Sequence, residues 1–350
     1  MTSHDRQPFA PQTHRSETRH EGPVPQDLLD RLHAQIVEYG LPATILPGSL
    51  DLHRGEATAT IRATQDTLAV KIGAPTDATL YQMRESVIFL LDQVAPRIGA
   101  TLRWSGSGPA RTRPPNFQLA SALGTERVGA NFLRVHMACE NVAALCVGGM
   151  HFSLLLPPTG MAPVWPILDD RMRTVWPTGA QALHRAAYTF VSLDPDRGRF
   201  SFDIYLHDGG QTTAWAQRLV GQEVVGIMGP GSGDFPVTED LLIAGDETAL
   251  PAIRRILEEA PAGLRGRAAI EIGDPADIVP IRAPAGMTLD WIVRGGERDL
   301  SHWLAQVDRL SRETFVWIAA EQATIRKVKP HLKALGVTRA HRYICHYWTR

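Results

Sequence analysis

The strand pattern of this chain changes at about residue 239, and the change limits the folds that are open to it. Residues 117–238 contain several short apolar or β-branched runs, and Asp194-Pro195-Asp196-Arg197-Gly198 has the composition of a hairpin turn between two of them. Residues 239–350 instead alternate short apolar strands with segments of helical spacing. The first pattern predicts an antiparallel β-barrel, and the second predicts a parallel α/β sheet.

The residues before the predicted barrel divide into three parts. Residues 24–104 combine an amphipathic helix, three short strand-like runs and a second helix, which predicts a small α+β domain of unknown role. Residues 105–116 are rich in Gly, Ser and Pro, and we interpret them as a linker. Residues 1–23 are polar and predict a flexible arm, whose histidines we do not interpret as metal ligands. We therefore expect a multidomain protein of mixed α+β and α/β class.

Composition excludes several classes of function. The chain has 350 residues, of which 44% are hydrophobic, so it can bury more than one core. Lys and Arg number 36 against 37 Asp and Glu, which predicts no nucleic-acid partner. The first residues lack the apolar core of a secretory signal, and the longest apolar stretch, residues 142–156, is interrupted by glycine and histidine. We expect a cytoplasmic protein with no membrane insertion, and the sequence does not indicate its oligomeric state.

A strand-to-helix turn at Gly245 is the strongest candidate for a ligand site. The residues that follow it, Asp246, Glu247, Thr248 and Ala249, would lie at the carboxyl end of a buried strand. Open α/β sheets bind their ligands at that end of the strands. Asp246 or Thr248 could instead only cap the helix, and the spacing alone does not decide between these roles.

Residues 207–216 carry groups that suit a phosphate. The segment begins with His207, and Gly210 is followed by Thr212 and Thr213 at the predicted start of a helix. Backbone amides beside glycine and hydroxyls at a helix start can bind a phosphate. The same composition also suits a surface loop that caps a helix, so this segment by itself leaves both roles open.

Residues 184–190 carry groups that suit an aromatic ring. Tyr188 lies on a predicted barrel strand, where its side chain can lie along a flavin, and Thr189 can hydrogen-bond the ring edge. A core tyrosine with a satisfied threonine is an equally good interpretation of the same two residues.

Taken in this order, the segments resemble the siderophore-interacting protein family of flavin-dependent ferric-siderophore reductases over about residues 117–350. Residues 151–157, 317–321 and 343–348 are also similar to landmarks of that family. The resemblance implies a ferredoxin-reductase-like arrangement, with FAD on the barrel (117–238) and NADH or NADPH on the α/β domain (239–350). It also implies that a ferric siderophore is the electron acceptor.

The segments and the resemblance together predict the cofactor-binding residues. These are Arg185, Tyr188, Thr189, His207, Gly210, Thr212, Thr213, Gly245, Asp246, Glu247, Thr248, Ala249 and Trp348. No side chain is expected to act as a catalytic acid or base, because the flavin carries the chemistry. No metal site is predicted.

The chain departs from the family where the family binds the flavin phosphate. The family has Arg two residues before the Tyr-Thr pair and again two residues after the pair, but this chain has Ala186 and Val191 there. Arg185 is one position early, so on a strand its side chain points to the opposite face unless a bulge re-aims it. A lost charge-assisted hydrogen bond costs roughly 1.5–3 kcal/mol, so we expect weakened FAD binding.

The resemblance leaves the substrate contacts open. An anionic ferric complex favours a basic rim, for which the candidates are Arg134, Arg171, Arg173, Arg326, Lys327 and Lys329. Two alternatives to the ferric-siderophore reductase are a general NAD(P)H:flavin reductase and a siderophore-binding or regulatory protein that has lost tight FAD binding.

Overall fold

The described residues fold into two compact units. The computed structural model describes residues 13–105, 112–231 and 235–349. The first unit holds the described residues up to Phe117 together with Ala162–Ala182, and the second holds Gln118–Met161 and the described chain from Leu183 onward. Within the described residues, no helix combines the length and the apolar character that are needed to cross a membrane.

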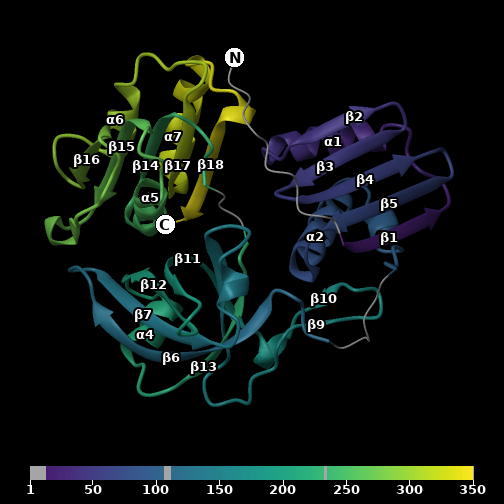
Figure 1. The fold of residues 1–350 in the computed structure, drawn as a ribbon, viewed down its shortest axis with the longest axis horizontal. Coiled ribbons are helices and arrows are strands. Elements are labelled where there is room, and N and C mark those ends of the chain that lie inside the picture. The colour runs from purple at the N-terminus through teal and green to yellow at the C-terminus, as the bar shows by residue number, and fades with distance from the viewer. Residues whose placement is uncertain (1–12, 106–111, 232–234, 350) are drawn as a thin grey trace. The chain divides into compact units, whose positions relative to one another are not determined.

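The first unit is an antiparallel sheet with helices on one face (Figure 1), as the small α+β pattern predicted. Its strand order is β1-β5-β4-β3-β2, and Leu50, Leu52, Ile61 and Val70 alternate along three strands so that their buried side chains share a face. Thr76 begins the longest helix with a capping box. The elements are β1 (His14–Glu21), α1 (Leu28–Glu38), β2 (Ala43–Leu46), β3 (Ser49–Arg54), β4 (Ala57–Ala63), β5 (Thr67–Ala74), α2 (Asp77–Val94) and α3 (Pro96–Gly99).

The flexible arm predicted for residues 1–23 is wrong for its second half. Residues 14–21 form β1, which pairs antiparallel with β5 along its whole length. The side chains of Ser16 and Thr18 are buried and donate to the carbonyls of Ser105 and Arg103. A polar edge strand of this kind carries no hydrophobic pattern, which is why it resembled an arm. Residues 1–12 lie outside the described residues, as do residues 106–111 of the predicted linker.

The predicted barrel domain 117–238 is not continuous in space. Residues 162–182 contain the short strands β9 (Ile167–Leu168) and β10 (Thr174–Val175) and belong to the first unit. Leu168 and Met172 are buried there, and the hydroxyls of Tyr81 and Thr174 are 2.6 Å apart. The segment leaves the barrel after one strand and returns at the start of another, so contacts far apart in the sequence, rather than composition, set this boundary.

The second unit begins with the predicted barrel, which closes in the order β11-β12-β7-β6-β13-β8. Its interior is filled by aromatic side chains: Phe152 stacks on Phe190 with ring centroids 4.4 Å apart, and Phe200 and Phe202 meet Phe152 edge-on. The strands are β6 (Phe117–Arg127), β7 (Phe132–Cys139), β8 (His151–Leu156), β11 (His184–Asp194), β12 (Arg199–Tyr205) and β13 (Val224–Met228), and α4 (Gln211–Gln217) follows β12.

The second unit ends with a parallel five-stranded sheet of order β16-β15-β14-β17-β18. The strand order reverses between β14 and β17, and such a reversal opens a crevice for a ligand at the carboxyl ends of the two strands. Helix α5 packs on one face of the sheet, and α6 and α7 pack on the other. The elements are β14 (Asp240–Gly245), α5 (Leu250–Glu258), β15 (Arg265–Ile272), β16 (Gly286–Val293), α6 (Leu300–Ala305), β17 (Phe315–Glu321), α7 (Gln322–Ala334) and β18 (Arg342–Trp348).

Candidate functional site

Gly245 ends β14 at the strand reversal, and the packing requires a glycine there. A Cβ atom at this position would lie 2.5 Å from the Cβ of Ala249 and 2.5 Å from the carbonyl oxygen of Ala319. The close approach brings the turn after β14 directly against β17. The predicted glycine turn therefore lies at the strand reversal.

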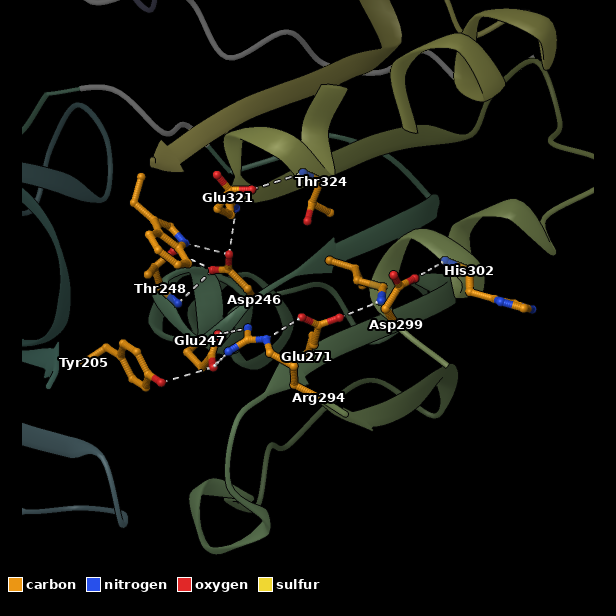
Figure 2. A network of polar contacts seen from close by, with 12 residues as sticks. Tyr205, Asp246, Glu247, Thr248, Glu271, Arg294, Asp299, His302, Glu321 and Thr324 are labelled. Carbon is orange, nitrogen blue, oxygen red and sulfur yellow. Dashed lines mark hydrogen bonds and ion pairs between the residues drawn. The ribbon is translucent and has the colours of Figure 1, made fainter. Parts of the chain in front are cut away.

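The Asp246 carboxylate holds the ends of three strands together. Its side chain is 3% exposed, and one carboxylate oxygen accepts hydrogen bonds from the N–H and hydroxyl of Thr248, at 3.0 and 2.6 Å. The other accepts from the N–H of Glu321 and from the indole of Trp348, at 2.7 and 2.8 Å (Figure 2). Burial raises the pKa of Asp246, and the hydrogen bonds from Thr248 and Trp348 oppose that shift. Asp246 thus caps the turn and also fixes the C-terminal aromatic residue.

Glu247 is a fully buried carboxylate with three hydrogen bonds. Arg294, which follows β16, binds it through both terminal nitrogens at 2.7 and 2.6 Å, and the Tyr205 hydroxyl donates to it at 3.2 Å. Arg294 also binds Glu271, whose second oxygen accepts the Leu300 N–H at the start of α6 (Figure 2). The hydrogen bond to Glu247 is the main reason that the pKa of Arg294 is raised. Since Tyr205 belongs to barrel strand β12, this network joins the barrel to the sheet.

Tyr188 and Thr189 lie on β11, where it pairs with β8. The Tyr188 ring is half-buried and packs against Phe152 and Phe202, and its hydroxyl is bonded to Thr212. Burial raises the pKa of Tyr188. The hydroxyl end of the ring is therefore held by the protein.

No bulge turns the Arg185 side chain into the place of the missing arginine. The register between β11 and β8 is continuous from residue 184 to residue 189, so Ala186 shares a face with Tyr188 and Arg185 lies on the other face. The irregularity of β11 lies farther along, between Phe190 and Ser192.

The segment after β12 is folded around Gly210. A Cβ atom there would lie 2.7 Å from the ring of His207, so a larger residue would displace that exposed ring. Gly210 precedes α4 without a side-chain cap, which leaves the backbone N–H groups of the first turn available to an anion. The Thr212 hydroxyl bonds His184 at 3.0 Å, and the Thr213 hydroxyl accepts the His207 N–H at 3.4 Å.

A histidine that the sequence interpretation gave no role connects the barrel with the sheet. His151 on β8 is 8% exposed, and its Nδ1 atom lies 3.0 Å from the Thr189 hydroxyl. Its Nε2 atom lies 2.9 Å from the hydroxyl of Tyr347 on β18. Burial, assisted by the charge of Arg255, lowers the pKa of His151 to about 4, so the ring is neutral. In the sequence, His151 stands at the start of an apolar strand and begins the landmark segment 151–157.

The six residues predicted for a basic rim lie on several different elements. Arg134 forms two hydrogen bonds with Asp203 across the barrel strands, at 2.7 and 2.9 Å. Arg171 donates to the carbonyl of Ala100, and Arg173 bonds Asp92, both within the first unit. The remaining candidates are exposed on α7, and they are Arg326, Lys327 and Lys329. Two of the six candidates thus belong to the first unit and four to the second.

The arrangement defines a class of protein. A closed antiparallel barrel that carries a Tyr-Thr pair, followed by a parallel sheet with its strand reversal at a glycine turn, is the architecture of ferredoxin-reductase-like flavoproteins. Within that class, residues 121–234 match the siderophore-interacting FAD-binding domain and residues 238–350 match the siderophore-interacting protein domain. The chain therefore belongs to the siderophore-interacting protein family over these residues.

Known proteins agree with this assignment. The chain is similar to SipS from Aeromonas hydrophila (24% identity, TM-score 0.58, 69% of this chain and 92% of that one). It is also similar to a siderophore utilization protein from T. fusca (25% identity, TM-score 0.58, 69% and 96%). A curated relative is the NADPH-dependent ferric-chelate reductase of Escherichia coli, with 26% identity over 65% of this chain and 91% of that protein. The chain spans only 26% of the mycobactin importer IrtA of Mycolicibacterium smegmatis, to which it is 26% identical.

Proposed function

We propose that the protein is an FAD-dependent reductase that passes electrons from NADH or NADPH to the ferric iron of a siderophore. One observation carries the proposal: Thr189 of the predicted flavin pair and Tyr347 of the sheet are joined through His151. This contact supports a single site that combines β11, the strand of the Tyr-Thr pair, with the carboxyl edge of the sheet. Because the electron donor is a nicotinamide cofactor, we expect the reaction to take place in the cytoplasm.

The residues present fit FAD, with one weak point. Tyr188 offers a half-buried ring beside the hydroxyl of Thr189, and the uncapped start of α4 offers backbone N–H groups for a pyrophosphate. The cationic side chain that would accompany them is absent, because position 186 is alanine. We expect FAD to bind, but less tightly than to relatives that carry the arginine.

The protein's own residues supply positioning. Bound FAD supplies the change from two-electron hydride transfer to the one-electron steps that iron requires. The strand reversal at Gly245 would hold the nicotinamide at the carboxyl edge of the sheet. Asp246 holds the Trp348 indole in place, and the Glu247–Arg294 pair fixes the edge against the barrel. One NAD(P)H reduces two Fe(III) complexes to Fe(II) and yields NAD(P)⁺ and one proton.

Spectroscopy and product trapping test the proposal. The purified chain, titrated with FAD, should develop a bound-flavin absorbance spectrum, and under anaerobic conditions it should oxidise NADH or NADPH when a ferric siderophore is added. A ferrous chelator should trap the Fe(II). Absence of flavin binding at high FAD concentration would defeat the enzyme and favour a siderophore-binding protein. Equal rates with ferric siderophore and ferric citrate would instead identify a general flavin reductase.

A further inference from the structure

Two hydroxyl groups and one imidazole form a continuous series of hydrogen bonds from the barrel to the last strand of the sheet. The distance from Thr189 Oγ1 to His151 Nδ1 is 3.0 Å, and the distance from His151 Nε2 to the Tyr347 hydroxyl is 2.9 Å. The His151 and Tyr347 rings meet edge-on at 88°, with centroids 5.6 Å apart. Thr189 is 5% exposed and His151 is 8% exposed, so water has little access to the bond between them, whereas Tyr347 is partly exposed.

Tyr347 reaches His151 because β18 is irregular at that residue. Ala320 on β17 pairs with His346 on β18, whereas the next residue of β17, Glu321, pairs with Trp348. Tyr347 is thereby the extra residue of a bulge, and bulges re-aim the side chain that they add. The neighbouring Trp348 keeps its bond to Asp246.

The chemistry of the three groups favours one direction for the hydrogen bonds between them. A neutral imidazole has one N–H donor and one lone pair, so it donates to one hydroxyl and accepts from the other. A phenol is the stronger acid and hence the better donor, and an aliphatic hydroxyl oxygen is the better acceptor. This order favours the tautomer in which Tyr347 donates to Nε2 and the Nδ1–H donates to Thr189. The hydroxyl hydrogen of Thr189 is then left for another acceptor.

We propose that His151 and Tyr347 are positioning residues that fix Thr189 as a hydrogen-bond donor toward the ring of the bound flavin. The inference rests on the proposed function, since it takes Thr189 to lie at the ring edge. In the opposite tautomer, the Thr189 hydroxyl would donate to His151 and could only accept a hydrogen bond from another group. A fixed donor favours the oxidised ring, which presents a nitrogen lone pair there, over the reduced ring, which carries a hydrogen.

The flavin midpoint potential measures this effect directly. Thr189→Val, which removes the hydroxyl, should weaken binding of oxidised FAD about fivefold while binding of reduced FAD changes little. At about 30 mV per tenfold for a two-electron couple, this raises the midpoint potential by about 20 mV. Tyr347→Phe and His151→Gln should give much of the same rise, and Thr189→Ser should restore the wild-type value.

A double-mutant comparison distinguishes an effect of the His151 and Tyr347 hydrogen bonds from a general loosening of the fold. Tyr347→Phe should add nothing to the potential of Thr189→Val, because both act on the same hydrogen bond. Tyr205→Phe is the matched control, since it removes a phenol hydroxyl that bonds Glu247 instead, and it should leave the potential unchanged. Unchanged potentials in Thr189→Val and Tyr347→Phe, or additive shifts, overturn the inference while FAD binding by the wild type upholds the proposed function. Failure of the wild type to bind FAD overturns both.

Discussion

The stability of the second unit should depend on pH through His151. Burial lowers the pKa of His151 from its ordinary 6.5 to about 4. Between these values the unfolded chain binds a proton that the folded chain does not, so stability is fully present above about pH 6.5 and is lost as the pH falls toward 4. At 1.36 kcal/mol for each unit of pKa, the loss amounts to about 3 kcal/mol.

Urea unfolding at several pH values tests this reasoning. Wild type and His151→Gln should be compared between pH 7.5 and pH 4, with the transition followed by tryptophan fluorescence. The difference between the two proteins cancels the titration of the carboxylates that they share. It should shrink by about 3 kcal/mol across this range, because glutamine does not titrate. His341→Gln, which changes an exposed side chain, should run parallel to wild type. Parallel curves for His151→Gln and wild type would show that His151 is not held neutral by burial.

Three further changes have defined outcomes. Ala186→Arg should tighten FAD binding about ten- to a hundredfold, measured by flavin titration; Ala187→Arg, on the other face of β11, is the control, and equal affinities would mean that Arg185 already fills the role. Arg294→Met should destabilise the chain by about 3 kcal/mol in urea unfolding, because it strands the buried Glu247 carboxylate; an unchanged midpoint would contradict the network. Deleting residues 1–104 should leave FAD binding intact but expose residues 162–182 to proteolysis, since these residues pack within the first unit; loss of FAD binding with normal circular dichroism would refute the expected division of roles.

The order of architectures could be predicted from the sequence because it rests on local patterns. Alternating strands in the barrel, strand–helix alternation after residue 239 and the glycine at the end of β14 are each encoded within a few neighbouring residues. Strand β1 could not be predicted from the sequence, because a polar edge strand has no apolar periodicity. The local pattern also assigns residues 162–182 to the barrel, because no motif in them indicates the surface on which they pack.

The amino-acid sequence determines which chemical groups this protein has. They include the Tyr-Thr pair and the acidic turn after Gly245, and they lack the arginine that the family has at the place of Ala186. How these groups are used depends on the three-dimensional packing. The spacing after Gly245 leaves the roles of the acidic residues open, whereas in the fold Trp348 donates to Asp246 and Arg294 donates to Glu247 from far away in the chain. The His151–Tyr347 contact joins residues 196 positions apart. Side-chain pairing over such separations depends on how strands from different layers meet, and no local pattern carries that information.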